Sequence, residues 1–228
     1  MTKVRRFQLW FGIVTLLLAT GSIHAQAAKY KEGEHFFRLP ATYKAPEEET
    51  DTESSGEIEV IEFFSYGCPH CSRMQPFVKN WLERKPEDVV LQREHVIFNA
   101  SSVPLARAYY IAEELKVLSE MHDKIFEVLH RHKVDIRSEE ALVQLFKNVA
   151  KVDAETFKEK YWAEETQEQI KEGNRKVSSW RISGTPSLVV GGKYLVTTES
   201  AKANHRRMFQ IVDFLVEKIR KESKETKL

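Results

Sequence analysis

The spacing of hydrophobic and polar residues predicts a strand, a helix and a second strand in the first half of this chain. Residues 58–64 are almost continuously apolar, which is typical of a strand buried on both faces of a sheet. From residue 68 the apolar positions take helical spacing, and Pro76 is expected to kink that helix rather than end it. Residues 89–98 again read as a strand. Together they predict a βαβ unit.

Residues 103–180 follow a different pattern, because their apolar positions recur at helical spacing. This segment predicts a block of helices inserted between strands, with the apolar stripes packed in its core. The stripes are Leu105, Ala108, Ala112 and Leu115, then Ile125, Phe126 and Leu129, then Ala141, Leu142, Leu145, Phe146 and Val149.

The C-terminal part returns to short apolar runs. Residues 187–190 and 194–196 flank Gly191 and Gly192, which predicts a β-hairpin with a glycine turn. Residues 204–221 then predict a closing amphipathic helix.

The N-terminal residues 1–27 predict a secretory signal peptide, because basic residues precede the apolar stretch 9–19 and small residues lead to a cleavage site near Ala27. An uncleaved anchor is the alternative, but the apolar stretch is shorter than the ~20 residues that a membrane-spanning helix needs. Behind the signal, residues 35–37 predict a short first strand, and the acidic segment 46–57 predicts a solvated loop.

The charge balance gives no support to two classes of partner. Without the three basic residues of segment 1–27, 32 of the 35 basic residues remain against 34 acidic ones. A balance so close to neutral gives no reason to expect nucleic acid or an anionic membrane surface as partner, since both usually require a basic face. The basic group Lys202, His205, Arg206 and Arg207 is expected to be a solvated helix face. Export also places the chain in an oxidising compartment, where disulfides persist.

Cys68 and Cys71 are the only two cysteines, and they lie where the first buried strand gives way to a helix. A cysteine at a helix N-terminus has its thiolate favoured by unpaired N–H groups and by the helix dipole. A structural disulfide across so few residues would remove little chain entropy, and a structural zinc site would need further protein ligands. Redox chemistry is therefore the leading hypothesis, with a local staple or an occasional metal as alternatives.

The run Glu-Phe-Phe-Ser-Tyr-Gly-Cys-Pro-His-Cys at residues 62–71, the helical insertion, and Gly-Thr-Pro at 184–186 resemble the DsbA family of thioredoxin-fold thiol:disulfide oxidoreductases. The resemblance covers essentially all of the chain after the signal. It implies an α/β thioredoxin fold with a helical domain inserted between the βαβ half and the C-terminal hairpin and helix. The implied domains are the signal peptide 1–27, the first thioredoxin half 28–102, the inserted helical domain 103–180 and the second thioredoxin half 181–228.

The resemblance assigns roles to the motif. Cys68 is the expected nucleophile, and Pro69 suits the first helical position, where its missing N–H is not needed. Orphan N–H groups, the helix dipole and a partly protonated His70 are expected to lower the pKa of Cys68. A stabilised thiolate stabilises the reduced protein, so the disulfide form should be a strong oxidant. Cys71 is expected to be more buried and to resolve mixed disulfides.

Glu62 is a charged side chain in an otherwise apolar strand, where an unpaired carboxylate would be costly. Burial would raise the pKa of Glu62 and suit it to carry the proton of Cys71, as the matching acid does in similar proteins. The alternative is that Glu62 points to a solvated edge.

By the same resemblance, Pro186 is expected to be a cis-proline beside the cysteines. Thr185, which stands where many members have valine, would offer backbone groups to an extended substrate peptide, and Pro69 is grouped with this substrate-binding surface. His130 and His132 lie two positions apart on a predicted helix and therefore face different ways. We predict no metal site and no cofactor.

These observations predict a periplasmic oxidase that donates the Cys68–Cys71 disulfide to reduced exported proteins and is reoxidised by a membrane quinone-linked partner of the DsbB type. A disulfide isomerase or reductase is the nearest enzymatic alternative, although residues 28–67 are too few for the dimerisation domain that isomerases of this superfamily carry. The alternative of another class is a thioredoxin-fold chaperone or adaptor with a structural disulfide. A monomer is expected.

Overall fold

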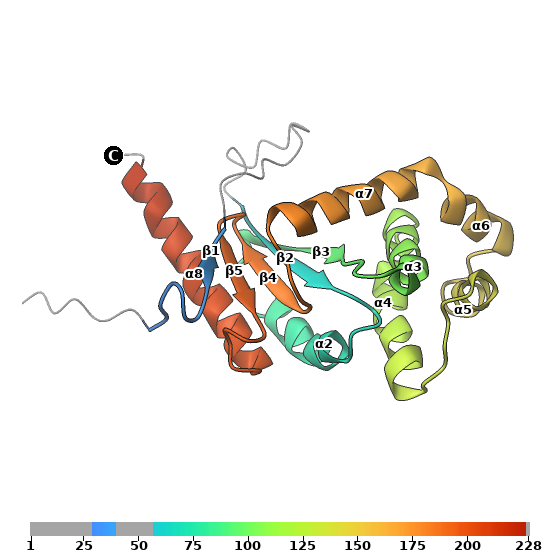
Figure 1. Cartoon of the computed structure of the whole chain (residues 1–228), viewed down its shortest axis with the longest axis horizontal. Coiled ribbons are helices and arrows are strands. Elements are labelled where there is room, and N and C mark those ends of the chain that lie inside the picture. Colours follow the sequence, from blue (N-terminus) through green and yellow to red (C-terminus); the bar gives the residue numbers. More distant parts are fainter. Residues whose placement is uncertain (1–28, 40–56, 227–228) are drawn as a thin grey trace, which may run out of the picture.

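The computed structural model describes residues 29–39 and 57–226 of the chain. The predicted signal peptide 1–27 lies outside these residues, as does all but the last residue of the predicted acidic loop 46–57. Within the described part, none of the helices combines the length and the apolar character needed to cross a membrane. A mixed sheet with helices against it continues at one end into a lobe made only of helices (Figure 1).

Five strands form one sheet in the order β1-β5-β4-β2-β3. The strand β2 (Ile58–Phe64) runs parallel to β3 (Val89–His95) and antiparallel to β4 (Ser187–Val190). All of β2 except Glu59 is buried, which explains its nearly continuous apolar sequence. The helix α2 (Pro69–Leu82) joins β2 to β3, so the predicted βαβ unit is confirmed.

The predicted hairpin lies between β2 and the edge strand β1. The strand β5 (Tyr194–Thr197) pairs with β4 across Gly191 and Gly192, whose φ angles are +57° and +61°. Glycine adopts this left-handed backbone without steric cost, which explains the glycine pair in the turn. The strand β1 (Phe37–Arg38) pairs antiparallel with β5, slightly later in the chain than the predicted 35–37.

The predicted strand 89–98 is too long by three residues. β3 ends at His95, and Phe98, which the apolar pattern counted as a strand position, is 52% exposed. The chain instead enters the short 3-10 helix η1 (Ala100–Ser102), where the side chain of Asn99 accepts a hydrogen bond from the N–H of Ser101 at 3.1 Å.

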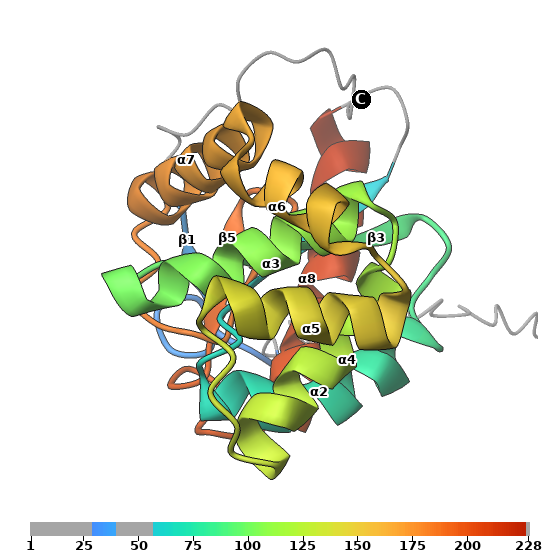
Figure 2. The same ribbon diagram turned by 90° about the vertical axis from the view of Figure 1, so that its right-hand side faces the viewer.

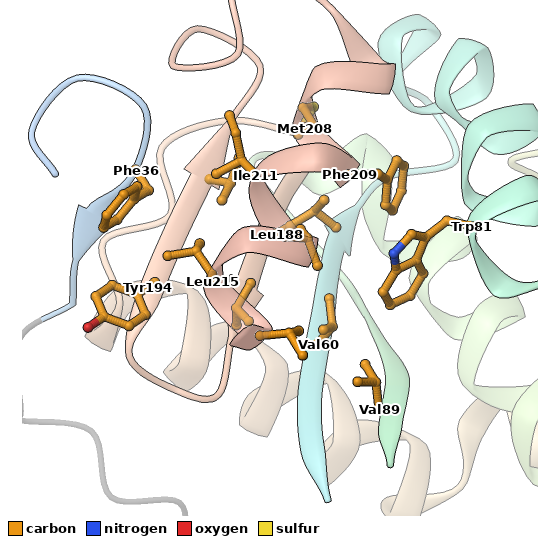
Figure 3. Packing of buried hydrophobic residues seen from close by; sticks show 14 of the residues in the cluster. Phe36, Val60, Trp81, Val89, Leu188, Tyr194, Met208, Phe209, Ile211 and Leu215 are labelled. Carbon is orange, nitrogen blue, oxygen red and sulfur yellow. The ribbon is translucent and has the colours of Figure 1, made fainter. Parts of the chain in front are cut away.

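The helices α2 and α8 (His205–Thr226) pack together against one face of the sheet (Figure 3). Their contact centres on Trp81, which stacks on Phe209 with ring centroids 5.4 Å apart and donates its indole N–H to Asp213 at 2.8 Å. Trp81 is fully buried, so its polar atom needs this partner. α2 continues through Pro76 to Leu82, as the sequence predicted.

The segment between the two halves of the sheet is helical, as predicted. Its helices gather at one end of the molecule around a second hydrophobic core (Figure 2). Side-chain caps at two of the helices, from Ser138 to the N–H of Ala141 and from Asp153 to the N–H of Thr156, fix where those helices begin. The elements are α3 (Val103–Glu114), α4 (Leu118–Phe126), the π-helical segment η2 (Glu127–Arg131), α5 (Glu139–Ala150), α6 (Ala154–Trp162) and α7 (Glu164–Ser179).

Gly173 lets α7 approach β3 and α3. Tyr110 of α3 donates a buried hydrogen bond to Glu94 of β3, and Lys176 of α7 pairs with the same carboxylate at 3.0 Å. A Cβ atom at residue 173 would lie 2.6 Å from the Tyr110 hydroxyl and would overlap the Glu94 carboxylate. A mid-helix glycine is therefore required by the close approach of these side chains.

Gly173→Ala is expected to destabilise the protein by about 2 kcal/mol. Helix propensity alone would favour alanine by ~1 kcal/mol, but overpacking costs about 1–3 kcal/mol and disturbs the buried Tyr110–Glu94 bond. Urea unfolding would measure the change. Arg175→Ala, on the exposed side of the same helix, is the control and should move the free energy of unfolding by less than about 0.5 kcal/mol. An unchanged or raised stability of Gly173→Ala would contradict the argument.

Candidate active site

The two cysteines occupy different environments at the start of α2. Cys68 is the N-cap residue, with extended backbone angles of −87° and 117°, and Pro69 is the first helical residue, as predicted. The Sγ of Cys68 accepts from the N–H of Cys71 at 3.5 Å. Cys71 is fully buried, whereas Cys68 is partly exposed, and both are free thiols in this structure. Only Cys68 is open to an approaching substrate.

The same environments separate the acidities of the two thiols. A hydrogen bond from the thiol of Cys71 lowers the pKa of Cys68 to about 5, although burial opposes the change, and the backbone N–H groups of Cys71 and His70 lower it further. Burial raises the pKa of Cys71, and its hydrogen bond to Cys68 raises it again. His70 acts here through its N–H, while its side chain is exposed. At neutral pH Cys68 is a thiolate and Cys71 a thiol.

Glu62 lies on the sheet face that α2 covers. It is fully buried, so the alternative of a solvated edge is excluded. Its carboxylate accepts from Nε of Arg93 at 3.1 Å and from Nε2 of Gln75 at 3.2 Å. Burial raises the pKa of Glu62 even though Arg93 and Gln75 both favour the ionised form. The same acid also raises the pKa of Cys71 through its charge.

Thr185 and Pro186 follow the helical insertion in the sequence, and the fold places them beside Cys68. The peptide bond between them is cis, as predicted. The Thr185 carbonyl accepts from Sγ of Cys68 at 3.3 Å, and the Pro186 carbonyl accepts from the hydroxyl of Thr198 at 3.2 Å. A carbonyl oxygen accepts only from the protonated thiol, so this contact does not lower the pKa of Cys68. The Cys71 thiol, the side chain of Thr185 and the backbone N–H groups account for the lowering.

Comparison with known proteins decides the family. A family model described as DSBA-like thioredoxin domain matches residues 59–210. The chain belongs to this family. The thiol:disulfide interchange protein DsbA of Bordetella pertussis is 31% identical over 170 residues, which are 75% of this chain and 80% of that protein. The DsbA of Pseudomonas aeruginosa is 28% identical over 217 residues, covering 93% of this chain and 98% of that one.

Solved structures of DsbA proteins agree. The crystal structure of Pseudomonas aeruginosa DsbA matches with a TM-score of 0.76 at 27% identity and covers 87% of this chain and 98% of its own. That of oxidoreductase DsbA from Xylella fastidiosa gives 0.73 at 27% identity, with 82% and 96% covered. The predicted thioredoxin fold with a helical insertion is confirmed, and this member of the DSBA-like family is a thiol:disulfide oxidoreductase.

Two histidines to which the sequence analysis gave no role in the site hold the backbone of Tyr66, just before the Cys-Pro-His-Cys motif. The ring of His95 accepts from the N–H of Tyr66 at 3.1 Å, and His130 contacts the carbonyl of Tyr66 at 2.7 Å. Burial lowers the pKa of His95 to about 3, so the ring is a neutral acceptor. His132 faces elsewhere and contacts Glu127 at 3.0 Å. Across the described residues, no three His, Cys, Asp or Glu side chains gather as a metal site.

The expectation that His205 lies on a solvated helix face is wrong, because its side chain is half-buried. Its ring packs edge-on against Phe77 of α2 with centroids 5.6 Å apart. Burial lowers the pKa of His205, the positive charges of His70 and Arg73 lower it further, and Cys68 opposes them. The start of α8 therefore borders the active site, which no local sequence signal indicates. Arg206 is exposed, as expected.

Proposed function

We propose that the chain donates the Cys68–Cys71 disulfide to newly exported proteins. The observation that carries this proposal is the contrast between the two thiols, because a pKa of about 5 at Cys68 stabilises the reduced protein. A protein readily transfers its disulfide to a substrate when its own reduced form is stabilised. The same low pKa makes Cys68 a good leaving group for the second half of the exchange.

The exchange proceeds in two displacements. A substrate thiolate attacks Sγ of Cys68, the Cys68–Cys71 bond breaks, and Cys71 leaves and takes up a proton. A second substrate thiolate then attacks the substrate sulfur of the mixed disulfide, and Cys68 leaves as the thiolate. The substrate loses two electrons as its disulfide forms, and the cysteine pair gains them. A membrane quinone-linked partner of the DsbB type would remove those electrons and restore the disulfide.

Glu62 is the proposed proton carrier for Cys71. Its carboxyl group is fully buried, and burial raises its pKa above that of an ordinary carboxyl group, the direction that suits a group exchanging a proton with a thiol. The ion pair with Arg93 at 3.1 Å keeps the ionised state accessible. Glu62 would thus give a proton to Cys71 when the disulfide is reduced and accept one when it forms again.

Thr185 is proposed to hold the substrate backbone, with Pro186 and the exposed Pro69 beside it. The Thr185 carbonyl lies 3.3 Å from Sγ of Cys68 and can accept from it only while Cys68 is protonated. Once Cys68 enters a mixed disulfide its sulfur carries no hydrogen, and the carbonyl is left to accept from a substrate N–H. An extended substrate segment would pair with this backbone in the manner of an added strand.

Cleavage of the signal peptide near Ala27 would release a monomer into the periplasm, where reduced exported proteins are the substrates. The division into thioredoxin halves 28–102 and 181–228 around the helical domain 103–180 would let the insertion vary without moving the cysteines. The reaction needs no cofactor, because both electrons pass between sulfur atoms.

Titration of the Cys68 thiolate tests the oxidase proposal. Absorbance of the reduced protein is followed against pH, with Cys68→Ser as the control that removes the signal, and the protein is equilibrated in glutathione buffers in parallel. We expect a pKa near 5 and a potential more oxidising than that of glutathione. A pKa near the free-thiol value of about 8.5, together with a strongly reducing potential, would instead favour a reductase or isomerase.

A further inference from the structure

A chain of polar side chains, buried except for the half-buried Gln75, leads from Glu62 into the helical insertion. Nε2 of Gln75 donates to Glu62 at 3.2 Å and to the carbonyl of Cys71 at 3.4 Å. Oε1 of Gln75 lies 3.1 Å from Nε2 of His122, and Nδ1 of His122 lies 3.0 Å from the hydroxyl of Tyr66. Gln75 belongs to α2, whereas His122 belongs to α4. The amide of Gln75 thus connects the two lobes beside Cys71.

The direction of these hydrogen bonds follows from the donors available. The NH₂ group of Gln75 donates to two acceptors, so the oxygen of the same amide must accept from Nε2–H of His122. Nδ1 of His122 is then unprotonated and accepts from Tyr66. Burial lowers the pKa of His122 well below its usual value, and the charge of Arg93 lowers it further, so the ring is neutral. Burial raises the pKa of Tyr66, which keeps its hydroxyl a donor.

The hydrogen bond from His122 helps to fix the orientation of the Gln75 amide. If the amide of Gln75 were turned around, its oxygen would face two acceptors, the Glu62 carboxylate and the Cys71 carbonyl, and its NH₂ would face a donor. The two acceptors and the N–H of His122 together disfavour the reversed amide, and His122 fixes the amide oxygen so that a donor stays on Glu62. We propose that Gln75 and His122 are positioning residues that orient the Glu62 carboxyl group for proton exchange with Cys71, so that the helical insertion takes part in the active-site chemistry.

This inference rests on the proposed role of Glu62 as the proton carrier. The groups that face Glu62 are Arg93 from β3, Gln75 and Cys71 from α2, and Tyr66 from the loop that joins them. On the remaining side its register partner in β4 is Leu188, which has no charge. Arg93 would hold one carboxyl oxygen and Gln75 the other, so each fixes a separate atom.

The step to measure is the closure of the active-site disulfide. Oxidised glutathione first forms a mixed disulfide with Cys68. Cys71 then attacks Sγ of Cys68, its proton passes to Glu62, the Cys68–Cys71 bond forms, and glutathione leaves as the thiolate with the electron pair of the broken bond. This second step is unimolecular. Acid quench and mass spectrometry give its rate as a function of pH, and the inflection of that profile reports the ionisation of Glu62.

Gln75→Met is the main variant, because methionine keeps the length of the side chain without its donor. Loss of a hydrogen bond to the ionised carboxylate should move the inflection to higher pH by about one unit. Gln75→Glu, which stays polar if the methionine variant folds poorly, also removes the donor and should move it the same way. His122→Phe should cause a smaller shift in that direction, because the amide still donates to Glu62 but loses the hydrogen bond that fixes its oxygen.

His130→Phe is the matched control, since His130 also contacts Tyr66 but has no contact with Gln75 among its hydrogen bonds in the described structure. Its inflection should stay at the wild-type pH. Glu62→Gln separates the two proposals. If it abolishes the inflection while the Gln75 and His122 variants leave it in place, the positioning role is overturned and the role of Glu62 stands. If Glu62→Gln keeps the inflection, the proton-carrier role itself is overturned and the positioning role with it.

Discussion

Replacing Cys68 by serine is expected to abolish disulfide donation completely. Oxygen cannot take the place of sulfur in the mixed disulfide, and the exposed position belongs to Cys68, since Cys71 is fully buried. Oxidation of a reduced peptide with two cysteines, followed by mass spectrometry, should give the rate of the buffer alone. Turnover above that rate would mean that Cys71 can be attacked directly, which would contradict the assignment of roles.

Cys71→Ala, unlike Cys68→Ser, should still form mixed disulfides with substrates. Cys68 loses the hydrogen bond from Cys71, but the backbone N–H groups still favour its thiolate, so it can still attack a protein disulfide while no second thiol is present to resolve the product. Mixed disulfides with exported proteins should therefore accumulate and disappear on reduction. The double variant Cys68→Ser/Cys71→Ala is the control and should capture nothing. If Cys71→Ala traps no protein in an oxidising cell envelope, the adaptor hypothesis gains over the oxidase.

The βαβ unit could be predicted from sequence because its signals are local. A strand buried on both faces must be apolar along its whole length, and β2 meets that condition except at Glu59 and Glu62. Pro69 marks the start of α2, since only the first turn of a helix tolerates proline without losing a hydrogen bond. The place of Cys68 at the helix N-terminus follows directly from these two signals.

The partners of Glu62 were not predictable in the same way. Arg93 faces Glu62 because β2 and β3 pair with residue 62 opposite residue 93, a register that periodicity alone does not give. His122 lies on a helix of the insertion, and its sequence context is that of any histidine in an amphipathic helix. Only the packing of two lobes brings His122 to Gln75. Sequence reasoning therefore found the acid but not the side chains that hold it.

Reduced wild-type protein is expected to gain stability over Cys68→Ala as the pH rises. The pKa of Cys68 is about 5 in the folded state and about 8.5 in an unfolded chain. Because the folded pKa is the lower one, the contribution is fully present above the unfolded pKa and is lost as pH falls through the folded pKa. The whole difference would be worth about 5 kcal/mol, which solvent screening at the partly exposed Cys68 reduces to about 2 kcal/mol.

Urea unfolding under reducing conditions between pH 4 and 10 would measure this difference, and Cys71→Ala is its matched control. Burial raises the folded pKa of Cys71, so only the unfolded chain ionises it above a pH of about 8.5. Wild type should therefore lose stability relative to Cys71→Ala as pH rises past that value, opposite in sign to the Cys68 difference. Parallel pH profiles for wild type and both variants would mean that the fold does not separate the two thiols, and the directional exchange would lose its physical basis.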